Sequence, residues 1–280
     1  MTLRIGPRTN QIIAYIFLLV CTISVISILF FIIAFVFKNG ITSLTWEFLT
    51  EKTRAMGREG GIFPSIIGTF VVTVFAIIVA TPLGVGSALY LTEYTRDSAT
   101  RRLISFGADC LAGVPSIIFG LFGFIFFVIT LKLGWSIVSG GFTLAVMILP
   151  TIIRTSEEAI KAVPKSYREI SYSLGVGKID TIFKIVLPTA FPGILTGIIL
   201  GIGRAVSETA AVIFTAGSSL NIPTSVFSST RTLAVHFYIL AREGISMPKA
   251  YGTATVLIIS ILFINFIAYR LMHRFIARYY

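Results

Sequence analysis

Charged side chains are scarce in this 280-residue sequence. Asp, Glu, Lys and Arg account for 12% of it, while 55% is hydrophobic. Soluble domains have roughly a quarter of their residues charged. The shortage of charge excludes a soluble globular enzyme, and the abundance of aliphatic and aromatic residues excludes a disordered chain.

Cysteine and histidine are also rare, with two of each. Cys21 and Cys110 lie inside apolar runs, so we interpret them as small hydrophobic residues and exclude a disulfide scaffold. His236 and His273 are distant from both in the sequence. We therefore expect no metal centre, no redox chemistry and no cofactor.

The charge that is present is mostly positive, since 23 Lys and Arg against 12 Asp and Glu give a net charge of +11. A nucleic-acid interface needs cations gathered on one soluble face with aromatic residues between them. Here the cations separate apolar segments, which is typical of a membrane protein with several spans. We expect contact with a lipid bilayer and not with nucleic acid.

A helix needs about 20 apolar residues to cross a hydrocarbon layer of roughly 30 Å. Six segments meet or approach that length, and they predict an all-α membrane protein with about six transmembrane helices. They are residues 12–37, 62–91, 103–131, 142–153, 193–217 and 251–271. The second and third contain Pro82 and Pro115 and are long enough to kink. The fourth is the weakest, because it is short unless Trp135 marks its end.

Six spans place both chain ends on one side of the membrane. The segments on that side carry 14 Lys and Arg, and those on the other side carry 8. Because cytoplasmic loops are enriched in Lys and Arg, we expect both termini and the loop 155–192 in the cytoplasm. The predicted parts are an anchor helix with the first external loop (1–61), a transmembrane domain (62–272) and a basic cytoplasmic tail (273–280).

The loop 155–192 is amphipathic. Its apolar residues recur at three-to-four residue spacing on both sides of Gly175, which predicts two short helices. Gly175 and Gly177 supply the turn between them. This pattern alone leaves open whether the loop packs against the bundle or docks on a partner.

A longer signature in this loop reads Glu169-Ile170-Ser171, three residues, Gly175, nine residues, Ile185, one residue, Leu187-Pro188. It resembles the EAA loop of ATP-binding-cassette (ABC) importer permeases, with Ile170 and Ser171 in place of two alanines. In that family the loop docks on a separate ATPase subunit. The resemblance implies an ATPase docking element that contains Glu169, Gly175, Ile185, Leu187 and Pro188.

The stretch from Gly175 to Ile179 matches only part of a phosphate-binding loop. A P-loop needs glycine five positions before its Gly-Lys pair and Ser or Thr after it, whereas Tyr172 and Ile179 occupy those places. We expect a transport subunit and not an enzyme, with ATP hydrolysed by a partner chain.

The fifth predicted span carries two charges. On a helical wheel, Arg204 and Glu208 share one face with Gly193, Gly197 and Gly201. A lone cation near the bilayer middle costs about 2.5 to 3.5 kcal/mol. Either the two charges neutralise each other and fix helix packing, or Arg204 binds a passing oxyanion while Glu208 keeps that binding weak enough for release.

Asp109 is a further charge inside a predicted span, about six residues from the start of the third. Either it pairs with a basic loop residue, or it takes part in the solute pathway. The candidate pathway residues are therefore Arg204, Glu208 and Asp109.

Several other stretches carry a closer resemblance. They include Gly60-Gly61-Ile62-Phe63-Pro64, Pro82-Leu83-Gly84-Val85-Gly86, Ala112-Gly113-Val114-Pro115-Ser116-Ile117 and Gly203-Arg204-Ala205-Val206-Ser207-Glu208-Thr209-Ala210. They resemble the PstA-type permease subunits of bacterial phosphate importers. The resemblance implies the type I ABC importer permease fold, a related PstC-type permease as heterodimer partner, two PstB-type ATPase copies and an extracytoplasmic phosphate-binding protein. Resemblance implies phosphate, whereas the residues alone imply an anion.

The resulting prediction is a permease of an ATP-driven phosphate importer in the bacterial inner membrane, working by alternating access. A permease for sulfate, molybdate or another oxyanion stays open, as does a membrane adaptor that regulates a sensor kinase and carries nothing. The external segment 218–250, with Arg231, Arg242 and Lys249, is either a docking site for the binding protein or a loosely held interfacial segment.

Overall fold

The computed structural model describes residues 7–95 and 99–279. The first six residues of the predicted anchor segment, residues 96–98 of the second loop and Tyr280 of the predicted tail lie outside the described residues.

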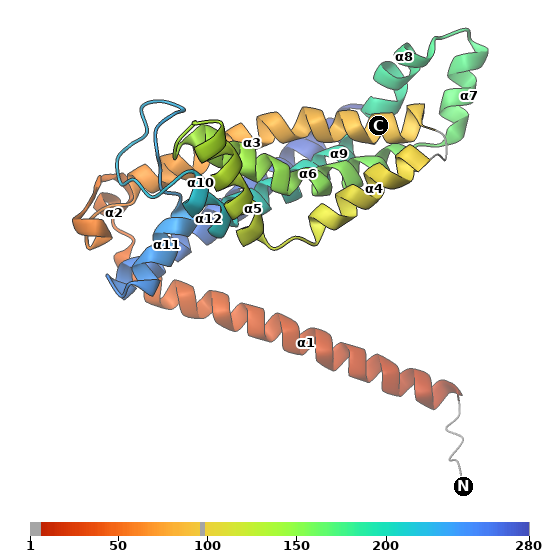
Figure 1. Ribbon diagram of the computed structural model, residues 1–280. Coiled ribbons are helices and arrows are strands. Elements are labelled where there is room, and N and C mark those ends of the chain that lie inside the picture. Colours follow the sequence, from red (N-terminus) through yellow and green to blue (C-terminus); the bar gives the residue numbers. More distant parts are fainter. Residues whose placement is uncertain (1–6, 96–98, 280) are drawn as a thin grey trace.

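The chain runs back and forth along a helical bundle (Figure 1). The longer helices are α1 (Pro7–Gly40), α3 (Phe63–Leu89), α4 (Ala99–Ala112), α6 (Ile137–Ala162), α9 (Leu187–Ser207) and α12 (Met247–Tyr279). The shorter ones are α2 (Trp46–Thr50), α5 (Ser116–Gly123), α7 (Lys165–Ser173), α8 (Lys178–Thr181), α10 (Ala210–Thr215) and α11 (Leu233–Arg242). The π-helical turns Tyr90–Tyr94 and Phe124–Thr130 extend α3 and α5, and Ile182–Val186 joins α8 to α9. Strands β1 (Thr53–Arg54) and β2 (Glu59–Gly60) pair antiparallel with Thr53 opposite Gly60.

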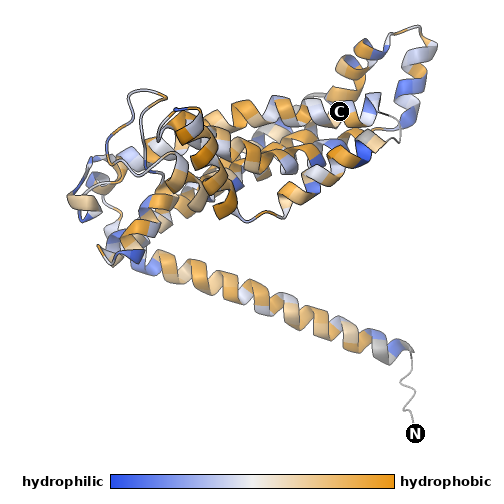
Figure 2. Cartoon of the chain, in the orientation of Figure 1, coloured by the Kyte–Doolittle hydropathy of each residue, from blue (hydrophilic) through white to orange (hydrophobic). Residues whose placement is uncertain are grey.

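The prediction of about six spans is confirmed. Within residues 7–95 and 99–279, five helices are long and apolar enough to cross a membrane, and a sixth span results if the bent pair Arg101–Ala112 and Ser116–Thr130 counts as one. In α1, none of the most apolar window is buried inside the protein, and Figure 2 shows this helix hydrophobic along most of its length. Such a helix is stable only where lipid or another chain covers it.

The third predicted span is not a gently kinked helix. Helix α4 ends at Ala112, α5 begins at Ser116, and the two are bent by 102°. Proline has no backbone N–H and disfavours helical geometry in the residue before it. Pro115 lies directly before α5 and explains why the apolar run turns sharply there.

The single helix predicted over 193–217 is wrong. A continuous helical segment runs instead from Lys178 to Ser207, and Glu208 then takes an extended backbone conformation before α10 begins. The fifth span therefore starts inside the predicted cytoplasmic loop and ends earlier than expected.

The weak fourth span is confirmed as α6, and its weak hydropathy has a structural cause. Of its most apolar window, 72% is buried inside the protein, against 33% for α3 and for the Lys178–Ser207 helix. Side chains that contact protein instead of lipid need not be uniformly apolar, so α6 carries the buried Ser139 and Thr143. The helix also continues past Ile153 to Ala162, so the first residues of the predicted loop 155–192 are helical.

Short helices lie at both ends of the bundle, and they come from different parts of the chain. Helices α7 and α8 lie at one end, and α2 and α11 lie at the other (Figure 1). The carboxyl end of the chain and the amino end of α1 both lie toward the α7 and α8 end.

Part of the predicted external segment 218–250 is packed into the bundle. Arg231, Leu233, Val235 and His236 are each at most 3% exposed, and the backbone N–H of Leu233 donates to Thr69 Oγ1 on α3 at 2.8 Å. Residues 224–227 are exposed, so the interpretation as a loosely held segment is wrong for the buried stretch 230–236 alone.

Glycine on α9 permits the close packing of α6 and α9, as the four-residue spacing of small residues predicts. A Cβ atom at Gly193 would lie 2.5 Å from Ala159 Cβ, and one at Gly197 would lie 1.9 Å from Thr155 Oγ1 and 2.8 Å from Thr155 Cβ. These separations leave no room for a side chain, so the glycines bring the two helices into contact.

We expect Gly197→Ala to destabilise the chain by about 1 to 3 kcal/mol, because rotation of Thr155 cannot remove the clash with its Cβ. The matched control is Gly203→Ala on the same helix, where a Cβ meets nothing within 4 Å. The control should be neutral or stabilising by up to about 1 kcal/mol, since alanine is the better helix former. Thermal unfolding of the purified chain in detergent measures both, and equal midpoints would contradict the assignment.

Candidate functional site

Two of the predicted pathway residues flank the break between α9 and α10. Arg204 lies half-buried in the last turn of α9. Glu208 follows the end of that helix with φ −75° and ψ 133°, and its Oε1 accepts a hydrogen bond from the backbone N–H of Ala211 at 3.2 Å. A carboxylate at a helix N-terminus is stabilised by the unpaired N–H groups there. The side chain of Glu208 thus caps the N-terminus of α10.

Arg204 has no carboxylate partner within residues 7–95 and 99–279. The predicted pairing with Glu208 assumed an unbroken helix, in which residues four apart share a face. Because α9 ends at Ser207, that geometry is absent. Arg204 lies instead in the last turn of α9, where a cation is favourable.

The break opens onto a cavity. Thr209 and Ala210, which follow Glu208 directly, line a cavity of about 990 Å³. Its other walls come mainly from α5, α10 and α11 and are largely apolar, with Ser218, Ser219, Ser229, Tyr238 and Arg242 as polar exceptions. Glu208 directly precedes the Thr209 wall in the chain, whereas Arg204 does not line the cavity.

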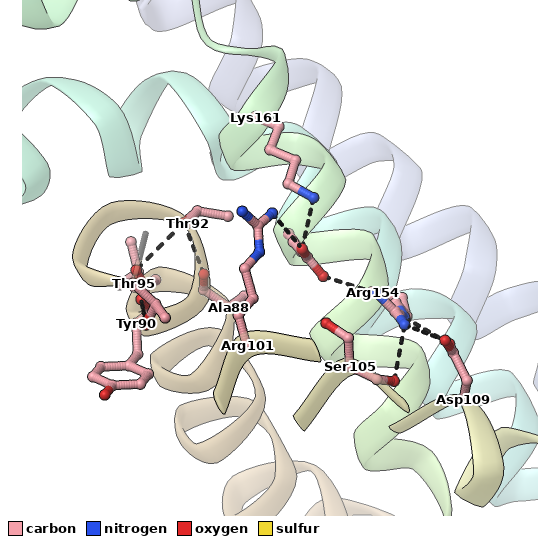
Figure 3. A network of polar contacts seen from close by, with 11 residues as sticks. Ala88, Tyr90, Thr92, Thr95, Arg101, Ser105, Asp109, Arg154 and Lys161 are labelled. Carbon is pink, nitrogen blue, oxygen red and sulfur yellow. Dashed lines mark hydrogen bonds and ion pairs between the residues drawn. The ribbon is translucent and has the colours of Figure 1, made fainter. Parts of the chain in front are cut away.

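The third candidate, Asp109, lies elsewhere. It forms a two-pronged ion pair between α4 and α6, with Arg154 Nε 2.9 Å from Oδ1 and Nη2 2.5 Å from Oδ2 (Figure 3). Arg154 also donates to the carbonyl of Ser105 at 3.0 Å. The structure thus brings Asp109 to a basic residue, as one of the two interpretations expected, and not to Arg204.

Glu157 is a buried carboxylate that the sequence interpretation missed. Its side chain is only 3% exposed and contacts Lys161 at 2.6 Å, Arg154 at 3.1 Å and Arg101 at 3.5 Å. The sequence does contain a signal for this ion-pair cluster, because Arg154, Glu157 and Lys161 have the i, i+3 and i+7 spacing that brings side chains together on one helix face. It was overlooked because these residues were assigned to a loop.

The predicted helix pair in the loop is confirmed as α7 and α8, with the turn at Gly175. Gly175 has φ +78°, a left-handed conformation that favours glycine, and the N–H groups of Gly175 and Val176 close the end of α7 onto Tyr172 and Ser171. Ser171, which replaces an alanine of the EAA signature, is 2% exposed and hydrogen-bonds Thr181 on α8 at 2.8 Å. The substitution therefore links the two helices.

The projection formed by α7, α8 and the π-helical turn Ile182–Val186 carries exposed apolar side chains along its length. They are Tyr167, Ile170, Tyr172, Leu174, Ile179 and Phe183. Six large apolar groups facing outward on one projection are typical of a surface that another protein covers.

The five predicted docking residues divide between two places. Glu169 and Gly175 are exposed on the projection. Ile185, Leu187 and Pro188 are half-buried where the projection joins α9, and Leu187 packs against a core cluster that includes Val186 and Ala190.

Arg168 and Glu93 tie this projection to the bundle, a contact the sequence interpretation missed. Arg168 Nη2 lies 2.7 Å from Glu93 Oε1 at the end of α3 and also donates to the carbonyl of Ile160, while Nη1 donates to the carbonyl of Val163. Lys178 at the start of α8 bonds the carbonyl of Glu93 and lies over the Tyr94 ring. The projection is therefore held by both α3 and α6.

Residues 80–279 match the family described as "Binding-protein-dependent transport system inner membrane component". The chain belongs to this family. The predicted family is confirmed, and the chain is a permease component of an ABC transporter with several membrane spans.

Three relatives illustrate the likeness. The chain is 33% identical to the "Probable ABC transporter permease protein YqgI" of Bacillus subtilis, over 89% of this chain and 90% of that protein. It is 38% identical to "Phosphate transport system permease protein PstA 1" of Mycobacterium tuberculosis H37Rv, over 78% of this chain and 71% of that protein. It is 32% identical to "Phosphate transport system permease protein PstA" of Pasteurella multocida, over 82% of both.

Solved structures share the fold at low identity. A chain of the alginate ABC transporter, crystallised with a pentasaccharide-bound periplasmic protein, matches with a TM-score of 0.66 at 14% identity, covering 94% of this chain and 96% of that one. A chain of the MetNI methionine transporter, in an inward-facing conformation, matches with a TM-score of 0.60 at 19% identity, over 77% and 94%. The predicted type I ABC importer permease fold is confirmed.

We expect Asp109→Asn to lower the free energy of unfolding by less than about 1 kcal/mol, because the Asp109 side chain is 63% exposed in its ion pair. Glu157→Gln removes a buried charge-assisted network and should cost about 2 to 3 kcal/mol. Unfolding of the purified chain measures both. Equal losses of unfolding free energy in the two variants would contradict the distinction between an exposed and a buried ion pair. If Asp109→Asn is stable but abolishes transport, Asp109 belongs to the solute pathway after all.

Proposed function

We propose that this chain is the permease subunit of an ATP-driven importer that carries inorganic phosphate across the bacterial inner membrane by alternating access. The observation that carries the proposal is Arg204, a half-buried guanidinium without a carboxylate partner among the described residues, in the last helical turn before a break that borders a cavity. Guanidinium presents a planar fork of donors that suits the oxygens of phosphate. Glu208 adds negative charge nearby, which keeps an anion from being held too tightly.

The choice of phosphate also draws on relatives. The Mycobacterium tuberculosis and Pasteurella multocida proteins are named phosphate transport system permeases, whereas the Bacillus subtilis protein is named only a probable ABC transporter permease. A permease for sulfate or molybdate is therefore the nearest alternative. A membrane adaptor that regulates a sensor kinase is the alternative of another class, and it would tolerate loss of Arg204.

Energy would come from an ATPase that docks on the α7 and α8 projection. The exposed apolar side chains of that projection suit a groove on a partner, with Glu169 and Gly175 at the contact. In this arrangement Ile185, Leu187 and Pro188 anchor the projection to the bundle. This places the projection and both termini in the cytoplasm, with two ATPase copies, a related permease and an extracytoplasmic phosphate-binding protein completing the complex.

One helix connects the docking end to Arg204. The continuous segment Lys178–Ser207 has 30 residues, about 45 Å of helical rise, and begins directly after the docking turn. A rigid helix moves as a unit, so displacement of the turn by ATPase closure would shift Arg204 relative to the cavity. Alternating access would then expose the guanidinium first outward and later inward.

Arg204→Ala should abolish phosphate uptake by the assembled transporter, because the anion loses its fork of donors. Arg204→Lys keeps the charge without the fork and should retain a minor part of the activity. Radiolabelled phosphate uptake into vesicles measures both, with competition by sulfate and molybdate to identify the solute. Normal uptake by the alanine variant, with the ATPase still attached, discards the pathway role and favours the adaptor.

Gly175→Val should weaken ATPase association, because a β-branched residue is strained at φ +78° and the turn must rearrange. The matched control is Gly177→Ala, two residues away, where φ is −66° and a Cβ meets nothing within 4 Å. Co-purification of the ATPase with the tagged permease measures the difference. Wild-type yield with Gly175→Val removes the docking role of this turn.

A further inference from the structure

Arg231 is a buried cation at the opposite end of the bundle from the docking projection. It is 3% exposed, and its Nε donates to the carbonyl of Ser218 at 3.1 Å. Its Nη1 lies 3.4 Å from Nδ1 of His236. A buried charge is costly unless it is paired, yet no carboxylate within the described residues forms an ion pair with this guanidinium.

His236 does not supply the missing negative charge. A guanidinium only donates, so Nδ1 must accept and the imidazole proton resides on Nε2. Burial, reinforced by the charges of Arg231 and Lys249, lowers the pKa of His236 to about 3. The ring is therefore neutral at physiological pH, and the charge of Arg231 stays uncompensated.

The uncompensated guanidinium borders open space. Arg231 lines a cavity of about 630 Å³ together with two further arginines, Arg58 and Arg242. Glu243 is the one acidic residue in that lining. Three cations against one carboxylate make this cavity electropositive, which favours occupation by an anion.

Local structure holds the other two arginines at the rim. Arg58 follows Gly57 in the hairpin formed by β1 and β2. Gly57 has φ +108° and packs so closely on α11 that a Cβ atom at Gly57 would lie 3.0 Å from His236 Cε1. Arg242 lies 5.5 Å above the Tyr238 ring and donates to its hydroxyl. Both side chains are exposed, unlike Arg231.

This cavity adjoins the larger cavity that Thr209 and Ala210 line. The two cavities share four lining residues, which are Ile213, Ser218, Tyr238 and Arg242. An anion near Arg231 is therefore one shared wall away from the cavity that follows the end of α9.

We propose that Arg231, Arg58 and Arg242 form an external anion site that takes a small inorganic oxyanion, phosphate first, at the mouth of the path to Arg204. Arg231 supplies the fixed, desolvated donor, and the two rim arginines attract and enclose the ligand. The role at the mouth of the path rests on the proposed function. Helix packing alone does not require the site, because a neutral donor at position 231 would satisfy the Ser218 carbonyl without burying charge.

Direct binding tests the site. The full-length chain in lipid nanodiscs, in an Arg204→Ala background that removes the inner guanidinium, is titrated with radiolabelled inorganic phosphate at low ionic strength. The double variant Arg58→Gln/Arg242→Gln should bind about tenfold more weakly, and Arg231→Gln should bind more weakly still. The matched control is Arg54→Gln, an exposed arginine on the same hairpin that does not line the cavity. Equal affinity in the double variant and the control overturns the proposal, even if Arg231→Gln fails to fold.

Uptake by the assembled transporter separates this site from the transport function. With Arg204 intact, the double variant should raise KM for phosphate about tenfold with kcat unchanged, and the difference should shrink in high salt. If the double variant has an unchanged KM and normal phosphate uptake, the external site is contradicted and the proposed function stands. If the wild-type transporter takes up no phosphate, the proposed function is contradicted, and phosphate binding in nanodiscs still tests the site. If the variant changes only the half-saturating concentration of binding protein, the arginines contact that protein and the proposal fails.

Discussion

The close contact between α6 and α9 is the constraint on which the rest of the arrangement depends. Gly193 and Gly197 remove the side chains that would separate these helices, so α9 packs directly on Ala159 and Thr155. This contact holds the helix between the Gly175 turn and Arg204 against α6, the most buried of the candidate spans among the described residues. Rigid packing of this kind lets a displacement at one end reach the other, since packed cores shift between discrete arrangements and do not deform gradually.

Three carboxylates that join helices are compensated by cations, whereas two arginines on the proposed path are not. Glu93, Asp109 and Glu157 each have arginine or lysine partners. Arg204 and Arg231 have no carboxylate partner within the described residues, although one is half-buried and the other almost wholly buried. These salt bridges hold helices together, whereas we propose that the guanidinium groups of Arg204 and Arg231 bind an anion. This asymmetry ties the two proposed anion sites together.

The fold itself does not select the solute. The structural relatives include a methionine transporter and an alginate transporter, and they share the arrangement of helices at 19% and 14% identity. Solute chemistry resides in a few side chains placed on that common scaffold. On this chain we propose that Arg204 and the three cavity arginines, Arg58, Arg231 and Arg242, supply the donors for an oxyanion.

The sequence by itself determined the approximate number of spans, the family and the turn at Gly175. Lipid-facing helices must be apolar over about 20 residues, and Gly175 is needed where the backbone turns left-handed, so both leave a local pattern. The tertiary structure decided what depends on distant contacts. Helix α6 has weak hydropathy because protein surrounds it, and the wheel that paired Arg204 with Glu208 failed because α9 ends between them. The burial of Arg231 was invisible for the same reason, since segments far away in the chain enclose it and no local pattern records them.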